Sequence, residues 1–322
     1  MPEAETIRSF PDIPVSAFAA VLGIAGLGLA WRKSAVVIGT APWIGEVMIF
    51  AGVLVFAWIA AAYGMKIMRA PFAMQAEFDD LAQASYLAVA PLSLQLFAAG
   101  ALPLDHAVAT LMWVIGTGAQ FILLLILLKR WMAGGQTRRN LRPSIFLPSG
   151  GLLICPATAS QLGFIEIGWM LFAVGALLWI LFLALLLDRL FFDMPMGDDE
   201  TPQLAIMITP PALAFMSYMA LNQQMIDGFA RFLFYVMMFF LIVTLTHSQR
   251  LMGLRFGMGW WSLTFPAAAA ASAAMEYRMA VGAYFPMALC VALLGLASVL
   301  VAYCAVRTLM GLQAGNLFKR II

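Results

Sequence analysis

The distribution of charged residues is the feature of this sequence that most restricts its fold. Ten stretches of 18 or more residues contain no Asp, Glu, Lys or Arg. A helix needs roughly 17–25 apolar residues to cross the hydrocarbon core of a bilayer, which is about 30 Å thick. The stretches are residues 13–31, 47–65, 81–104, 106–128, 143–165, 167–187, 201–226, 232–249, 256–275 and 279–306. We therefore expect an all-α integral membrane protein in which ten transmembrane helices form a single domain over residues 1–322.

The composition supports a lipid environment and argues against several functions. Hydrophobic residues make up 64% of the chain and charged residues 11%, against about 45–50% and about 25% in soluble proteins. The net charge of +2 offers no basic surface for nucleic acid. The two histidines, His106 and His247, are expected near opposite faces of the membrane, without a carboxylate at the same depth in their spans. We therefore expect no metal, no cofactor and no enzymatic activity.

The residues between the spans predict both orientation and a repeat. With an even number of spans the termini share one side, and 14 of the 18 Lys and Arg residues fall on that side. Because cytoplasmic loops are rich in Lys and Arg, we expect cytoplasmic termini and a multi-pass protein of the bacterial inner membrane. On the opposite side, spans 3 and 4 are separated by Asp105 alone and spans 5 and 6 by Glu166 alone. These tight connections predict a helical hairpin that is used five times.

Proline distinguishes the first helix of each predicted hairpin from the second. Of the 16 prolines, ten lie within odd-numbered stretches and one within an even-numbered stretch. Those well inside their stretches are Pro91, Pro156, Pro210, Pro211 and Pro266. Proline interrupts helical hydrogen bonding, and such backbone is tolerated in lipid only where it is buried in protein or lines a cavity. We expect proline-kinked odd helices inside, around a central pore, and even helices outside.

The expected pore has few polar groups. Its hydroxyls would come from Ser93, Thr158, Thr209 and Thr264. Neither a ring of carboxylates nor a ring of basic side chains is available, so composition leaves the sign of a permeant ion open. Positive helix N-termini at the kinks would favour an anion, whereas freed carbonyls would act in the opposite direction. In the first span, Gly23 is a candidate pore or flexibility position, and close helix packing explains it equally well.

The ninth stretch contains a candidate gate. Phe265 stands beside Pro266 and before five alanines, 267–271. A phenyl ring next to a run of small side chains can project into the space that they leave open. We therefore interpret Phe265 as a steric gate.

Several short motifs, taken in order, resemble the family of TehA and the plant slow-type anion channels. They are Trp-Ser-Leu-Thr-Phe-Pro at 261–266, residues 21–32 of the first span, Pro91, residues 146–148, Gly175 with Trp179, and residues 211–213 with Asn222. The resemblance implies a homotrimer in which each protomer has its own pore, closed at mid-membrane by a phenylalanine that corresponds to Phe265. It also implies conduction of small monovalent anions such as chloride and nitrate, with selectivity set by ease of dehydration.

A secondary transporter or exporter of small organic acids or of oxyanions such as tellurite is the alternative interpretation. Many such carriers contain two inverted halves, so irregular helices should recur five spans apart. Here the prolines recur at every second span. The proline pattern therefore favours a channel.

Overall fold

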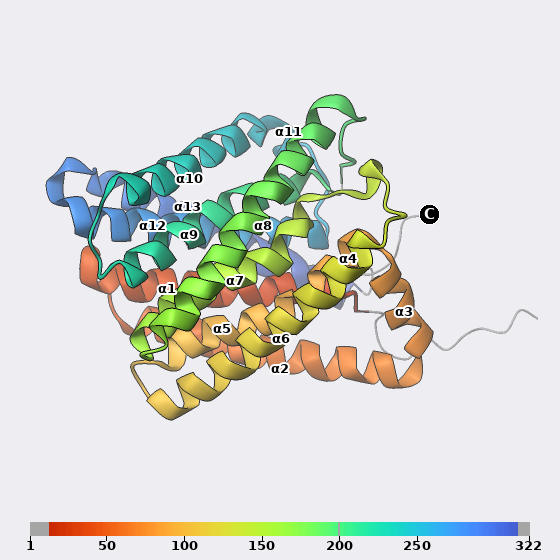
Figure 1. Ribbon diagram of the computed structural model, residues 1–322, viewed down its shortest axis with the longest axis horizontal. Coiled ribbons are helices and arrows are strands. Elements are labelled where there is room, and N and C mark those ends of the chain that lie inside the picture. Colours follow the sequence, from red (N-terminus) through yellow and green to blue (C-terminus); the bar gives the residue numbers. More distant parts are fainter. Residues whose placement is uncertain (1–12, 199, 315–322) are drawn as a thin grey trace, which may run out of the picture.

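The structure is a computed structural model that describes residues 13–198 and 200–314. Within these residues every regular element is helical, which confirms the expected all-α class. Figure 1 shows the long helices running roughly along one common direction, with the short α3 (Pro71–Asp79) at one end of the bundle. The other short elements are η2 (Arg138–Asn140), α11 (Ser248–Met252) and η6 (Gly282–Tyr284).

Each odd-numbered stretch contains two helices in series. A 3₁₀ or short α-helix comes first, and a longer α-helix follows it. We call these pairs the inner segments: η1 (Val15–Phe18) with α1 (Ala19–Val37), α4 (Leu81–Tyr86) with α5 (Val89–Ala101), η3 (Pro143–Ile145) with α7 (Phe146–Gln161), η4 (Thr201–Ile208) with α9 (Thr209–Leu221), and η5 (Met258–Leu263) with α12 (Thr264–Val281).

Each even-numbered stretch is instead occupied mainly by one long uninterrupted α-helix. We call these five the outer helices: α2 (Trp43–Arg69), α6 (His106–Met132), α8 (Ile165–Phe192), α10 (Gly228–Thr246) and α13 (Met287–Gln313). Proline is absent from their interiors, so the backbone bonding of each helix continues from end to end. The alternation of proline along the sequence therefore corresponds to an alternation of broken and continuous helices.

The inner segments form a closed ring. Helix α1 packs against α5, α5 against α7, α7 against α9, α9 against α12, and α12 against α1. Each outer helix packs against the inner helix that precedes it in the chain, as α2 does on α1 and α8 on α7. The ring is thus surrounded by the continuous helices.

Burial follows the same division. In the candidate spans of three inner segments 72–78% of the residues are buried, against 22–33% in the five outer helices. The outer helices expose large apolar side chains at helical spacing, for example Trp43, Val47, Phe50, Leu54 and Trp58 on α2. Apolar stripes of this length are typical of a surface that faces lipid, since soluble monomers rarely expose them.

By length and composition, eight of the described helical elements can cross a membrane. The two remaining stretches, 143–165 and 256–275, contain η3 with α7 and η5 with α12. These segments are rich in small and polar residues, and they lie almost entirely in the interior of the bundle. Their low apolar content therefore reflects contact with protein rather than with lipid.

The prolines lie at a different place in the helices from the one predicted. Among the prolines that the structure describes, Pro156 alone lies beyond the first turn of an α-helix. Pro91, Pro211 and Pro266, like Pro148, are the third residue of α5, α9, α12 and α7, and Pro210 is the second residue of α9. Proline is tolerated in a first turn because its missing N–H would have no partner within the α-helix there. These prolines therefore mark junctions between two helices instead of kinks within one.

Helices also continue past the charges that bounded the predicted spans. Helix α1 extends through Lys33 to Val37, and α12 extends through Glu276 to Val281. Glu276 is buried, and its carboxylate pairs with the ammonium group of Lys33. Pairing lowers the cost of taking a charge out of water, which explains how an acidic residue lies within the last turns of an inner helix.

Candidate functional site

A cavity lies where the five inner segments converge. Its volume is ≈ 30 Å³, which is enough for about two water molecules. Every inner segment contributes to its wall. The lining residues are Ala19, Leu22, Tyr86, Val89, Leu92, Phe146, Leu147, Gly150, Ile206, Thr209, Pro210, Leu213, Trp261, Ser262, Phe265 and Pro266.

The cavity lies at the level where the short helices give way to the long ones. Ala19, Val89, Phe146 and Thr209 are each the first residue of an α-helix, and each of them lines it. The change from a 3₁₀ or short helix to an α-helix alters the direction in which successive side chains point. The cavity thus lies beside the junctions between the two helices of the inner segments.

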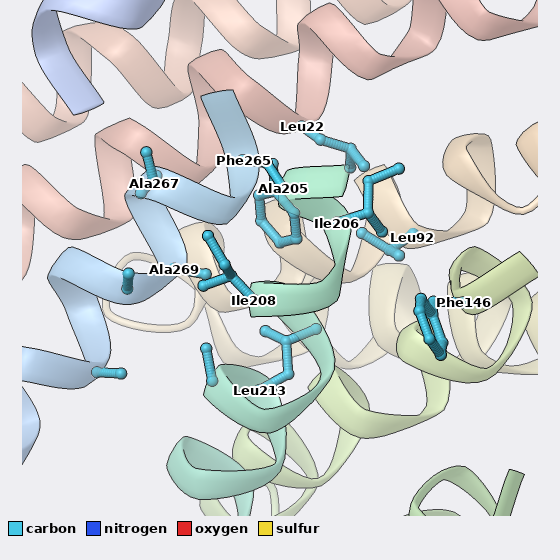
Figure 2. Close-up of a cluster of buried hydrophobic side chains, with 14 of the residues drawn as sticks. Leu22, Leu92, Phe146, Ala205, Ile206, Ile208, Leu213, Phe265, Ala267 and Ala269 are labelled. Atoms are coloured by element: carbon cyan, nitrogen blue, oxygen red, sulfur yellow. The ribbon is translucent and has the colours of Figure 1, made fainter. Parts of the chain in front are cut away.

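Phe265 lines this cavity and is only 6% exposed. Figure 2 shows its ring projecting from α12 into the cluster that includes Leu22 and Ile206. The ring also lies against the backbone of α1, because a Cβ added at Gly26 would come within 2.7 Å of Phe265 Cδ2. Gly26 thus provides room for the aromatic ring of Phe265.

Charged side chains are absent from the described lining of the cavity. Within the described residues there is also no group of three His, Cys, Asp or Glu residues that could hold a metal ion. Four lining side chains carry polar atoms. Tyr86 Oη and Ser262 Oγ form a hydrogen bond of 3.1 Å, and Trp261 Nε1 donates to Thr308 Oγ1 at 2.9 Å. The fourth, Thr209, is 6% exposed, and its buried Oγ1 has no partner in the structure.

The other three predicted pore hydroxyls lie away from the cavity lining. Ser93 Oγ donates to Val89 O at 2.8 Å, and Thr264 Oγ1 donates to Trp261 O at 2.7 Å. Thr158 is buried farther along α7. Only Thr209 of the four predicted hydroxyls belongs to the lining.

The predicted kink and flexibility residues also separate into two groups. Pro210 and Pro266 line the cavity, whereas Pro91, Pro156 and Pro211 stand outside its lining. Gly23 stands outside it too, and a Cβ added there would come within 2.1 Å of Thr264 Oγ1. Of the two interpretations of Gly23, the structure thus fits close helix packing.

The backbone donors at the junctions are already bonded. The N–H groups of Phe146, Thr209 and Thr264 donate to carbonyls in the preceding 3₁₀ helices, as does that of Ala19. Near Pro156, two side chains from other helices donate to backbone carbonyls: Ser217 Oγ donates to Leu153 O, and Trp113 Nε1 donates to Cys155 O at 3.0 Å. The first N–H group of four of the inner α-helices is thus engaged.

Tyr86, Phe146 and Trp261 line the cavity but were not predicted as site residues. A positional signal exists for them, because the lining repeats relative to the prolines at the junctions. Tyr86, Ile206 and Trp261 each lie five residues before such a proline, and Val89, Phe146 and Thr209 lie two before. Alignment of the odd stretches on Pro91, Pro148, Pro211 and Pro266 would have identified these residues.

Together, the helical bundle, its exposed apolar stripes and its interior cavity define a multi-pass integral membrane protein. The chain belongs to the SLAC1 family, described as voltage-dependent anion channel, whose family model matches residues 12–309. This match confirms the resemblance found in the sequence.

Similar proteins occur in plants and bacteria. The chain is 24% identical over 322 residues to the guard cell S-type anion channel SLAC1 of Arabidopsis thaliana, which covers 96% of this chain and 58% of the plant protein. It is 24% identical to the S-type anion channel SLAH3 of the same plant, over 96% of this chain and 52% of that protein. It is 23% identical to the tellurite resistance protein TehA homolog of Haemophilus influenzae, over 84% and 82% of the two chains. The chain thus spans little more than half the length of these two plant relatives.

Proposed function

We propose that this protein is a channel for small monovalent anions such as chloride and nitrate, and that Phe265 is its steric gate. The observation that carries the proposal is the ring of five inner segments around a cavity without charged side chains, which Phe265 lines. Membership of a family described as voltage-dependent anion channel supports an anion, rather than a cation, as the permeant ion.

The closed state follows from the size of the cavity. A space of ≈ 30 Å³ holds about two water molecules. An anion with its full hydration shell is larger than this space, so it cannot pass while the phenyl ring is in place. Removal of the ring extends the cavity between α12 and α1. In a narrow conduit without basic side chains, the cost of dehydration ranks the anions, and the weakly hydrated ones pass best.

The proposal includes ten membrane crossings arranged as five hairpins, with both termini in the cytoplasm. Its support is the packing of each outer helix on the inner helix that precedes it and the excess of Lys and Arg on the side of the termini. A bacterial inner membrane is the proposed location. Reporter fusions after α2, α6 and α8 would test the orientation, because the proposal places all three reporters in the cytoplasm. An external reporter after α2 would contradict it.

Each chain of a proposed homotrimer would contain its own pore. All sixteen lining residues come from one chain, so the conduit does not depend on an interface between chains. Native mass spectrometry of the solubilised protein tests the trimer, and a monomeric mass would contradict it.

The test of the proposed function is Phe265→Ala in reconstituted bilayers. We expect chloride current to rise by on the order of tenfold or more, because a hydrophobic constriction is removed. Phe182→Ala is the matched control, since Phe182 is also 6% exposed but packs against Trp131 outside the cavity. Phe265→Leu, which removes less volume, should give an intermediate current and a smaller risk of misfolding.

Three results would contradict the proposal. Currents of Phe265→Ala and Phe182→Ala that are equal at equal protein amounts would reject the gate. A reversal potential that follows the cation gradient would reject anion selectivity. Flux that saturates and requires a coupling gradient would favour a secondary transporter.

A further inference from the structure

An ion pair connects α1 and α12 at the end that the proposed orientation places on the outer side of the membrane. The five long helices of the inner segments contain four charged side chains, all near this end. Arg32 is paired with Glu46 of outer helix α2, and Arg278 donates to backbone carbonyls of the residues that follow α12. The other two, Lys33 of α1 and Glu276 of α12, pair with each other.

On α12, the acidic member of the pair lies on the same face as the proposed gate. Phe265, Ala269, Ser272 and Glu276 follow the spacing of one helical face, which repeats at intervals of three and four residues. They are 6%, 4%, 7% and 6% exposed, whereas every other residue in the range 268–275 is 0% exposed. The exposed line thus runs from the gate to Glu276, a distance of about 16 Å along the helix axis.

Helix α1 carries a matching line on the side of its neighbour α12. The line consists of Leu22, Gly26, Leu29 and Lys33, which have the same spacing as the four residues of α12. Leu22 lines the cavity, a Cβ added at Gly26 would approach the ring of Phe265, and Leu29 is half-buried. Lys33 therefore occupies the same place above the cavity on α1 as its partner does on α12.

Helix α7 shows the same pattern. Within 151–159 its half-buried residues are Ile154 and Ala157, which continue the face of the cavity-lining Gly150. Three helices of the ring thus keep some exposure on the faces that begin at the cavity. We infer that the conduit continues along these faces to its outer end, where Lys33 and Glu276 meet.

The two charged groups of the pair differ in how well they can be reached. The side chain of Glu276 is 8% exposed and that of Lys33 is 25% exposed. An ammonium group has three donors, and among the described residues Glu276 Oε2 is the one acceptor bonded to Lys33 Nζ. A buried ion pair is weak evidence for stability, because apolar residues often serve as well in its place. A reachable cation with further donors, on the pore-facing side of α1, therefore indicates a role toward anions.

We propose that Lys33 binds the permeant anion at the outer end of the conduit, and that the carboxylate of Glu276 is its built-in competitor. This inference rests on the proposed function and adds a charged site outside the narrow, uncharged section around Phe265. An anion that arrives from outside takes the place of the carboxylate on the ammonium group, so that the cation is balanced in either state. The competitor keeps anion binding weak enough for the anion to leave toward the cavity.

The first experiment measures anion binding without conduction. Crystals of the unmodified protein, of Glu276→Gln and of the double variant Lys33→Met/Glu276→Gln are soaked in bromide, and anomalous scattering locates the ion. Glutamine keeps the size of glutamate and can accept the same hydrogen bond, and the double variant leaves no unpaired charge, so both should fold. We expect a stronger peak beside Lys33 Nζ in Glu276→Gln than in the unmodified protein, and no peak in the double variant.

Two results of this experiment would overturn the inference. One is a peak in Glu276→Gln that is absent or no stronger than in the unmodified protein. The other is a peak that persists in the double variant, because that ion would not depend on the ammonium group.

The second experiment measures chloride entry from the outer side in the Phe265→Ala background. Glu276→Gln should lower the external chloride concentration for half-maximal flux by about tenfold, because the anion no longer competes with a charged hydrogen-bond acceptor. The double variant should reverse this gain. Glu46→Gln is the matched control, since it removes the same charge from the neighbouring pair, in which Arg32 Nη2 lies 2.6 Å from Glu46 Oε2. Equal shifts in Glu276→Gln and Glu46→Gln would show an effect of surface charge alone and would reject the site.

The two proposals fail in different ways. If Phe265→Ala carries no anion current but bromide binds at Lys33 in Glu276→Gln, the proposed gate is rejected and the anion site stands. If Phe265→Ala conducts anions and Glu276→Gln leaves the concentration dependence unchanged, the site is rejected and the channel stands.

Discussion

Two adjacent glycines in α7 allow a sharp test of where the conduction path runs. Gly150 lines the cavity, and a Cβ built there meets no heavy atom within 4 Å. Gly151 faces the other way, and a Cβ built there would lie 2.2 Å from Gln120 Nε2. The same substitution by alanine should therefore have opposite effects at neighbouring positions.

The expected magnitudes follow from these surroundings. Gly150→Ala should raise the free energy of unfolding by about 0.5–1 kcal/mol, because glycine is that much less favourable than alanine within a helix. Gly151→Ala displaces the buried Gln120 amide, which donates to Leu147 O at 3.1 Å and Pro148 O at 2.8 Å. Overpacking and the loss of these bonds together should lower the free energy of unfolding by about 2–5 kcal/mol.

The effect on conduction separates the two sites further. In the Phe265→Ala background, Gly150→Ala adds a methyl group to a cavity of ≈ 30 Å³ and should reduce chloride conductance severalfold without loss of stability. Conductance is measured in planar bilayers and stability by thermal unfolding in detergent. Gly118→Ala on α6, where an added Cβ meets nothing within 4 Å, controls for helix propensity. Equal conductance of the single and double variants would refute the placement of the cavity on the pathway.

Two other substitutions test the packing of Phe265 against α1 and the capping of α10 by Asp227. Gly26→Ala should lower the free energy of unfolding by about 1–3 kcal/mol through overpacking, since its Cβ would come within 2.7 Å of Phe265 Cδ2; in the Phe265→Ala background this loss should disappear, and a loss of equal size in both backgrounds would contradict the contact. Outside the predicted spans, hydrogen bonds from the Ala230 N–H and the Tyr218 hydroxyl to the Asp227 carboxylate lower the pKa of Asp227. Because the folded pKa lies below the unfolded value of about 3.9, the stabilisation is present above that pH and is lost as pH falls through the folded pKa. The stability difference between the parent and Asp227→Asn should therefore shrink below about pH 4 in thermal unfolding, and a difference independent of pH would contradict this assignment.

The sequence predicted the helical class and the division into inner and outer helices because both depend on simple energetic rules. Charges are costly in lipid, and backbone interrupted by proline is tolerated in a membrane where surrounding protein satisfies the freed polar groups. The exact ends of the helices depend on interactions that the sequence does not reveal. Helix α12 continues through Glu276, whose carboxylate pairs with Lys33, a residue distant in the sequence.

The candidate site was predicted less completely than the fold. Phe265 and Thr209 were among the predicted residues, and both line the cavity. Whether a hydroxyl faces the cavity or a neighbouring turn depends on rotation about the helix axis, so Ser93 and Thr264 could not be excluded beforehand. The prolines were misplaced within their helices because a break between two helices and a kink within one have the same sequence signature.

The position of the prolines has a consequence for conduction under the proposed function. A free helix N-terminus would present up to four unpaired N–H groups to the pore, and such a site would hold an anion tightly. Here a 3₁₀ turn bonds the first N–H at four of the five junctions, and a proline removes the third N–H at four of them. Rapid conduction requires binding that is favourable enough for entry yet weak enough for exit. A ring of junctions poor in free donors meets that requirement better than five open helix ends would.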